Sequence, residues 1–233
     1  MRHRGKHSSD DKIFTPKWQA VLKEAAQDLS FLLGRGYADK SSLMLVGNRY
    51  QLNTRQQKAL MRISCPSDRI GLRKGKELKP EAIKDQKIII DGYNLLITIE
   101  VALSGGLLFD TMDNCYRDIA SLHGTYKKVE ETIPALELVG EALQKLEVKE
   151  VLWYFDAPVS NSGRLKVLLY ELAGKYGYSW QIELVNNPDK TIIEHNQISV
   201  SCDGWIIDET DQWFNLARYV IEDSIPQAEI LKF

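Results

Sequence analysis

The stretch KIIIDGYNLL, residues 87–96, decides how the rest of the chain is interpreted. Three isoleucines run directly into Asp91, and Gly92, Tyr93 and Asn94 follow before the apolar run resumes. A short, continuous apolar run indicates a strand that is buried on both faces, as in a parallel sheet. Asp91 then marks the carboxyl end of this strand, Gly92 lets the backbone turn, and Asn94 begins a helix beside the same crevice.

Apolar runs of strand length alternate with helical patterns through the C-terminal part of the chain. After the strand at 87–91, the pattern predicts helices between about 96 and 147. Further strands are expected at 150–156, 179–185 and 197–203, and further helices at 163–177, 189–196 and 211–223. Apolar strands between helices are typical of a sheet covered on both faces. The predicted fold class is therefore α/β, with a Rossmann-like, mainly parallel sheet flanked by helices.

A small helical domain is expected before this sheet. Residues 15–36 carry apolar side chains at helical spacing, with Thr15 as a candidate N-cap and Pro16 at the first helical position. Further helices are predicted at 38–47 and 55–64. The chain then divides into a basic flexible arm (1–12), a basic helical domain (13–66), a basic linker (67–86) and the α/β domain (87–233).

The net charge of −2 conceals an uneven distribution of charge. Residues 1–90 contain 19 Lys and Arg against 9 Asp and Glu, whereas residues 91–233 contain 11 against 23. A basic front suggests contact with a polyanion such as the backbone of RNA or another nucleic acid. Solvated faces can also differ in charge without any such partner. The candidate contacts are Arg55, Arg62, Arg73 and Lys74.

Acids follow each of the predicted strands. They are Asp91, Asp156, Asp203 and, a few residues beyond the tip of its strand, Asp189. Because the carboxyl ends of parallel strands share one edge, where α/β proteins bind ligands, we expect these carboxylates to converge. Each one taken alone could equally be a helix cap or a turn residue.

Converging carboxylates need a partner of opposite charge. The segments WYFDAP (153–158) and SCDGW (201–205) contain no Lys or Arg. Oxygen-only ligands suit Mg²⁺ or Mn²⁺ and do not suit zinc. Such a cation could orient a phosphodiester, lower the pKa of a water and stabilise the leaving oxygen.

Cysteine usage indicates a reducing compartment. Cys65, Cys115 and Cys202 are far apart and form no CxxC pair, which argues against a disulfide scaffold or a cysteine-rich zinc site. Residues 1–12 lack the apolar core of a signal peptide. We therefore expect a cytoplasmic protein, and the sequence leaves a homodimer open.

One apolar run is long enough to suggest a membrane span. It covers residues 88–109, but Asp91, Asn94 and Glu100 interrupt it. A carboxylate near the centre of a bilayer is costly, so a buried strand followed by a helix explains the run better. We expect no contact with a membrane.

Three motifs resemble those of a known nuclease family. IIIDGYNLL resembles the first strand of NYN domains, a branch of the PIN-like nucleases, which ends in Asp-Gly-x-Asn. VLWYFDAPVSNSG (151–163) resembles their second motif, and ISVSCDGWIID (198–208) resembles the late PIN motif. The resemblance covers about residues 86–222. At the front, LVGNRYQLNTRQQKALMRISCP (45–66) is similar to the N-terminal part of the DUF434 family, a label that implies no activity.

The resemblance implies a PIN-like fold with a metal-dependent nuclease site. Asp91 would be the central ligand, Asn94 its companion, and Asp156 and Asp203 the second and late acids. Catalysis would rest on these three aspartates, and Asp189 matches the metal set less securely.

A long segment between the first two strand motifs departs from the family pattern. It covers residues 107–132 and adds several polar residues. Asp113 and Arg117 are spaced as an i, i+4 pair and could simply pair on a helix. Arg117 or His123 could instead contact a phosphate or the leaving group.

The leading functional hypothesis is a Mg²⁺- or Mn²⁺-dependent nuclease that prefers RNA, an endoribonuclease. One alternative is a non-catalytic RNA-binding module with a degenerate PIN-like pocket. Another is a small-molecule phosphohydrolase in which Asp91 is the nucleophile. The second acid expected for that chemistry, two residues later, is absent because position 93 is Tyr.

Overall fold

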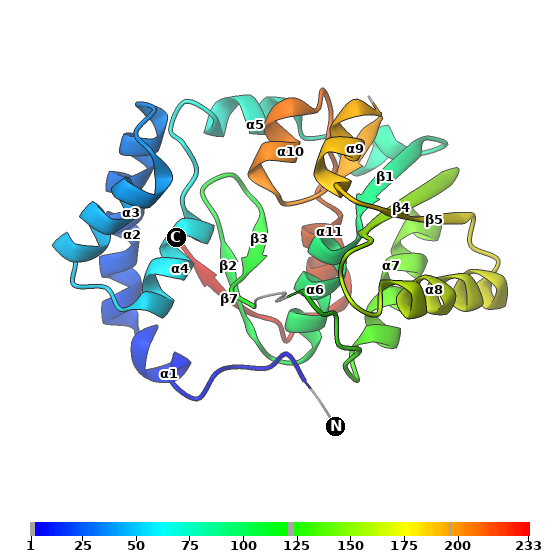
Figure 1. The fold of residues 1–233 in the computed structure, drawn as a ribbon, viewed down its shortest axis with the longest axis horizontal. Helices are drawn as coiled ribbons and strands as arrows, with labels where there is room; N and C mark the ends of the chain where they lie inside the picture. The colour runs from blue at the N-terminus through cyan, green and yellow to red at the C-terminus, as the bar shows by residue number, and fades with distance from the viewer. Residues whose placement is uncertain (1–2, 121–123, 196) are drawn as a thin grey trace.

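The apolar strand at the start of the α/β part lies inside a four-stranded sheet. Figure 1 shows the arrangement of helices and strands in the computed structural model. The structure describes residues 3–120, 124–195 and 197–233. The main sheet has the order β5-β4-β1-β6, and all of its strand pairs are parallel. Its strands are β1 (Lys87–Asp91), β4 (Glu150–Asp156), β5 (Trp180–Val185) and β6 (Ile198–Val200). The predicted parallel α/β sheet is therefore confirmed.

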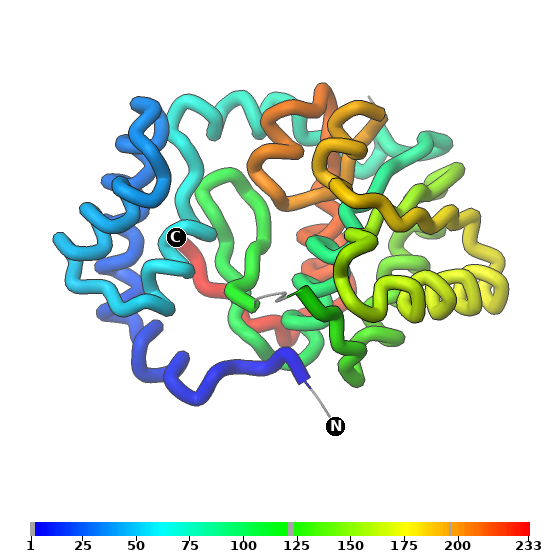
Figure 2. Tube along the Cα trace, viewed as in Figure 1, coloured from blue at the N-terminus to red at the C-terminus, as the bar shows by residue number. Residues whose placement is uncertain are grey.

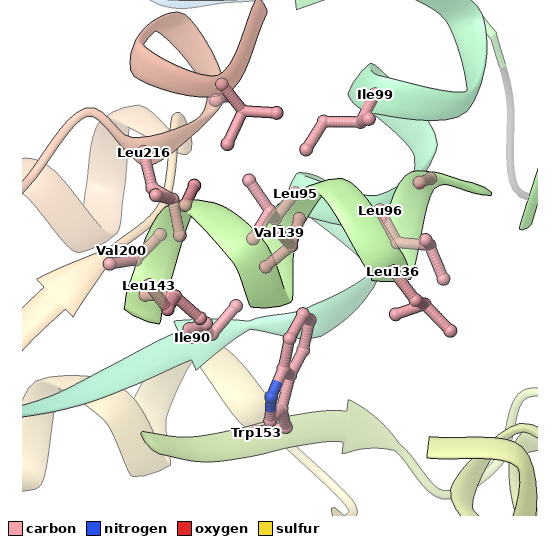
Figure 3. Packing of buried hydrophobic residues seen from close by; sticks show 14 of the residues in the cluster. Ile90, Leu95, Leu96, Ile99, Leu136, Val139, Leu143, Trp153, Val200 and Leu216 are labelled. Carbon is pink, nitrogen blue, oxygen red and sulfur yellow. The ribbon is translucent and has the colours of Figure 1, made fainter. Parts of the chain in front are cut away.

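Helices cover both faces of the main sheet, which explains why β1 is apolar throughout. One face carries α6 (Gly92–Leu103), α7 (Thr132–Lys145), α8 (Ser162–Tyr176) and α11 (Leu216–Ser224). On this face, Ile90, Trp153 and Val200 pack against the helices (Figure 3). The other face carries α9 (Pro188–Glu194) and α10 (Gly204–Glu209), which pack Ile192 and Ile206 against Ile89.

The expectation that only helices lie between about 96 and 147 is wrong. Residues 107–118 form a hairpin of β2 (Leu107–Asp110) and β3 (Tyr116–Asp118), and β7 (Glu229–Lys232) pairs with β2 in parallel. The small sheet has the order β3-β2-β7. Leu108 faces the core of the main sheet, while Phe109 and Leu107 face the N-terminal helices. This alternation with a period of two suits a strand between two cores.

The three helices predicted in the N-terminal part form, but they share their core with the small sheet. They are α2 (Pro16–Gly34), α3 (Asp39–Arg49) and α4 (Thr54–Ile63), and a short helix that was not predicted, α1 (Asp10–Ile13), precedes them. Asn53 begins α4 with a capping box. Its side chain accepts hydrogen bonds from two backbone N–H groups, and its own backbone N–H donates to the Gln56 side chain. Phe14 and Leu22 pack with Phe109 in one apolar cluster. The segment 13–66 therefore does not enclose a core of its own.

The segment expected to be a linker is partly helical and is held beside the main sheet by Trp213, which bridges to Ser199 of β6. It contains α5 (Ile70–Lys76) and a 3₁₀ turn, η1 (Pro80–Ile83). The Leu78 N–H donates to the Trp213 carbonyl at 2.8 Å, and the Trp213 N–H donates to the Lys76 carbonyl at 3.2 Å. Figure 2 shows this segment passing from the N-terminal helices to the main sheet, while β7 returns to those helices.

The N-terminal arm was expected to be flexible, but its described residues are anchored. Arg4 forms an ion pair with Glu100, a carboxylate with no exposed surface. Asp10 is also buried and accepts two hydrogen bonds from Arg55, at 2.5 and 2.8 Å. Among the described residues, no helix is both long enough and apolar enough to cross a membrane.

Candidate functional site

The candidate site lies at the carboxyl edge of the main sheet, where the strand order reverses. The chain proceeds from β1 to β4 and β5 on one side, whereas β6 lies on the other side of β1. Ligand sites in open α/β sheets form outside the strand ends at such a switch point. Asp91 ends β1 between these two directions, level with Tyr154 of β4.

Two side-chain contacts join the end of β1 to the end of β6. The Ser201 hydroxyl donates to Asp91 Oδ2 at 2.8 Å, and the backbone N–H of Cys202 donates to Asn94 Oδ1 at 2.9 Å. Asp91 is only 8% exposed. Burial and the charges of Asp189 and Asp203 raise the pKa of Asp91 to about 7, and the Ser201 hydrogen bond opposes this rise only in part.

Asp203 has a local structural role as well as a place at the site. Its Oδ1 accepts the Trp205 N–H at 2.8 Å, so it caps the N-terminus of α10. Its side chain also lines a pocket beside Asn94. Asp203 is therefore a helix cap, as the alternative interpretation proposed, and it lies at the carboxyl edge of the sheet as well.

Asp156 and Asp189 complete the group of four predicted acids. Asp156 is the last residue of β4, and Asp189 lies in the first turn of α9, which packs against β1 and β4. Burial, then the charges of Asp203 and Asp156, raise the pKa of Asp189. The acids therefore lie close enough to repel one another, and none forms an ion pair with another described residue.

The chemistry of these donors fits a hard divalent cation, but their positions do not form a finished metal site. All four side chains offer only oxygen, as Mg²⁺ and Mn²⁺ prefer. Within the described parts of the chain, no group of three or more His, Cys, Asp or Glu side chains is placed to hold a metal ion. A cation would therefore have to draw these carboxylates together.

The pocket next to Asp203 has a volume of about 220 Å³ and brings in residues from the small sheet and from α4. Asp118 lines it, accepting hydrogen bonds from the Thr98 hydroxyl at 3.0 Å and the Ala120 N–H at 2.8 Å. Burial raises the pKa of Asp118, and the charge of Arg62 opposes this rise. Arg62 lines the same pocket and is exposed.

Two residues that line the pocket, Asp118 and Tyr93, were not predicted from the sequence as site residues. The Tyr93 ring lines the pocket and is 8% exposed, and its hydroxyl has no hydrogen-bond partner among the described residues. Burial and the charge of Asp156 raise the pKa of Tyr93 to about 12. Its position directly after the Asp91-Gly92 turn is a usable sequence signal, whereas the position of Asp118 depends on the hairpin.

Arg117 and Asp113 pair, which was one of the two alternatives, but they pair across a hairpin turn and not on a helix. Arg117 donates to both oxygens of Asp113 at 2.7 Å, and Arg73 donates to Asp113 Oδ2 at 2.6 Å. Arg117 Nε also donates to the Cys202 carbonyl at 2.7 Å. Arg117 therefore lines the pocket while its charge is already paired, and it fixes the backbone next to Asp203.

The other predicted substrate contacts are dispersed. Arg73 is buried against Asp113 and Asp208, where its charge is compensated. Arg55 is paired with Asp10, and Lys74 is exposed on α5. His123 lies outside the described residues. Of the four basic residues predicted in the N-terminal part, only Arg62 lines the pocket at the acids.

Two family models match the chain. Residues 80–219 match the family described as Domain of unknown function (DUF5616), and residues 21–76 match Protein of unknown function (DUF434). The second match confirms the resemblance of the N-terminal part. An uncharacterized protein of Methanocaldococcus jannaschii is 29% identical over 211 residues, which cover 91% of this chain and 98% of the relative. No solved structure matches the chain.

Proposed function

We propose that this chain, which belongs to the DUF5616 family, is a PIN-like, metal-dependent nuclease that hydrolyses phosphodiester bonds in RNA. The observation that carries this proposal is the group of aspartates at the switch point of the main sheet. Asp91 lies at its centre, with Asp203 on one side and Asp156 on the other. No described cation neutralises these acids by an ion pair, which favours an added divalent cation.

Each side chain at the site has a role that follows from its contacts. Asp91, Asp156, Asp189 and Asp203 would hold Mg²⁺ or Mn²⁺. Ser201 and Asn94 would keep the ends of β1 and β6 together, through the 2.8 and 2.9 Å hydrogen bonds. When bound, the cation would supply positive charge that stabilises the developing charge on the phosphate oxygens.

Arg62 is the residue best placed to orient the phosphate. It is exposed, it lines the pocket that contains Asn94 and Asp203, and it forms no ion pair with a described residue. In the hydrolysis, a water oxygen bonds to phosphorus as the bond to the leaving oxygen breaks. The water gives up one proton and the leaving oxygen takes one, which gives one phosphate monoester end and one hydroxyl end.

A non-catalytic RNA-binding module is the second candidate function. The observation that favours it is the lack of a preformed three-acid metal site in the described residues. A module of this kind would bind RNA through Arg62 and other cations but would leave the strand intact. Metal binding and cleavage therefore separate the two candidates.

The test is an Asp91→Asn variant, assayed for Mn²⁺ binding by calorimetry and for cleavage of a labelled RNA. The nuclease proposal predicts weaker Mn²⁺ binding and a loss of cleavage of about 100-fold or more, with RNA binding retained. Asp211→Asn is a matched control, because Asp211 is exposed at the opposite, amino edge of the main sheet. Full cleavage by Asp91→Asn, or intact RNA with wild-type protein and Mn²⁺, would refute the proposal.

A further inference from the structure

A second pocket lies beyond the end of β4, on the same edge of the main sheet as the acids. It has a volume of about 460 Å³ and lies between the loop at 126–128 and the first turns of α8. The Tyr126 N–H donates to the Ser160 carbonyl at 3.1 Å, and Asn161 Nδ2 donates to the Tyr126 carbonyl at 2.9 Å. These bonds hold the loop against the segment that leaves Asp156.

The charge of this second pocket is opposite to that of its surroundings. Lys127, Lys128 and Arg164 line it, with Glu171 as the one acid among its lining residues. All three cations are exposed, and none forms an ion pair with a described residue. They meet in the part of the chain where acids outnumber bases, 23 to 11. A set of uncompensated cations in an acidic domain is complementary to a phosphate.

The floor of the second pocket is apolar. Val167 is 56% exposed, and Leu168 and Leu165 lie beside it along α8. An apolar floor beneath a set of cations matches a nucleotide, whose base has a flat apolar face and whose phosphate is anionic. In a duplex the base faces are stacked on one another, so an unpaired nucleotide fits this surface better.

The two pockets are separated by one pair of aromatic rings. Tyr93 lines the pocket beside Asp203, Tyr126 lines the second pocket, and their ring centroids are 5.4 Å apart. The two pockets are therefore neighbours, within the reach of one oligonucleotide of a few residues.

An exposed indole lies on the opposite flank of the acids. Trp205 is 50% exposed, and its backbone N–H is bonded to Asp203 at 2.8 Å. Trp205 lies in the first turn of α10, which follows β6, and the second pocket lies beside the segment that follows β4. In the sheet, β1 lies between β4 and β6 and ends in Asp91. Aromatic side chains beside a nucleic-acid path commonly stack on unpaired bases.

We propose that a single-stranded nucleic acid lies along the carboxyl edge of the main sheet, with a phosphate at Lys127, Lys128 and Arg164 and a base on Trp205. This inference rests on the proposed function and specifies its substrate as a single strand, not a mononucleotide or a duplex. The acids lie at the middle of this path, so the bond that is cut is internal to the strand.

The test measures binding of a fluorescent single-stranded oligonucleotide to the full chain by anisotropy at several salt concentrations, with RNA and DNA probes in separate arms. The triple variant Lys127→Ala, Lys128→Ala, Arg164→Ala is expected to bind about tenfold or more weakly. Three lost phosphate contacts should also reduce the slope of log affinity against log salt by about 2. The matched control removes the same charge elsewhere, with Lys145→Ala, Lys149→Ala and Lys175→Ala.

Trp205→Ala gives an independent readout, because stacking does not depend on counterion release. It is expected to weaken binding while leaving the salt slope unchanged. Tyr37→Ala is its control, since Tyr37 is 62% exposed on the N-terminal part. Wild-type affinity in both test variants, or equal binding of a duplex and a single strand, would overturn the single-strand path.

Cleavage of bis(p-nitrophenyl) phosphate with Mn²⁺ separates this inference from the proposed nuclease activity. The triple variant should retain this cleavage, because the small diester does not reach the second pocket. If wild-type protein cleaves neither substrate, the nuclease proposal fails, while the binding measurements still decide whether the strand path exists.

Discussion

Asp113 stabilises the site without lining it. Its side chain is fully buried between Arg117 and Arg73, and Arg117 in turn holds the carbonyl that precedes Asp203. Burial alone would raise the pKa of Asp113, but the charges and hydrogen bonds of the two arginines hold it well below its usual range. Arg73 also pairs with Asp208, but the buried charge of Arg117 is compensated only while the Asp113 carboxyl stays ionised.

Replacing Asp113 by Asn should therefore be costly, because it leaves buried arginine charge uncompensated. We expect Asp113→Asn to lower the free energy of unfolding by about 3–5 kcal/mol in urea titrations. Because the folded pKa is depressed, the carboxylate contributes stability above about pH 4, and this is lost as the pH falls toward the folded pKa. The variant should lack this part of the acid sensitivity. Equal stability of variant and wild type between pH 5 and 7 would contradict the role of Asp113.

At the scale of elements, the junction between β1 and α6 depends on close packing. The residue pattern predicted that Gly92 lets the backbone turn, but the structure shows a different reason for glycine there. A Cβ at position 92 would lie 2.4 Å from Cε1 of Phe155 on β4. Glycine therefore lets α6 begin directly after Asp91 while β4 packs against the junction.

A methyl group at this position should force the helix away from the strand. We expect Gly92→Ala to lower the free energy of unfolding by about 1–3 kcal/mol, through overpacking against Phe155. Shortening the neighbour in a Gly92→Ala, Phe155→Leu double variant should recover part of this loss, and a double-mutant cycle measures the coupling. Additive effects of the two substitutions would show that the glycine is required for another reason.

At the scale of the whole molecule, the small sheet joins two cores. One face of β2 packs against the main-sheet core through Leu108, and the other packs against the N-terminal helices through Phe109. The Phe109 ring lies 5.5 Å from that of Phe14 and 6.0 Å from that of Phe233. The helices and the α/β part should therefore unfold as one cooperative unit.

Phe109→Ala tests this coupling. The cavity should lower the free energy of unfolding by about 3–5 kcal/mol. Amide hydrogen exchange should then show reduced protection in α2 and in β1 alike, because the cores share the small sheet. Loss of protection confined to α2 would instead show that the N-terminal helices open independently.

The sequence predicted the main sheet well because its signals are local. The apolar runs at β1, β4, β5 and β6 end in acids or polar turns, and the parallel arrangement then places Asp91, Asp156 and Asp203 on one edge. The small sheet could not be predicted in this way. Its strands have only three or four residues, and β7 pairs with β2 across more than a hundred residues.

The same distinction applies to the site. Asn94 was predictable from its position next to Asp91, whereas Asp118 reaches the pocket only because β3 belongs to a hairpin. The burial of Arg73 was not predictable either, since its partners Asp113 and Asp208 lie far along the chain. Composition indicated a basic front, but which cations are already paired depends on tertiary structure.

The position of β7 has a consequence for the order of assembly during synthesis. The N-terminal helices leave the ribosome before the small sheet, yet their apolar cluster includes Phe109 of β2, and Leu231 of β7 packs against it. These helices therefore keep an unfinished apolar face until β7 has been synthesised. An early part of the chain thus waits for a much later strand before its core is complete.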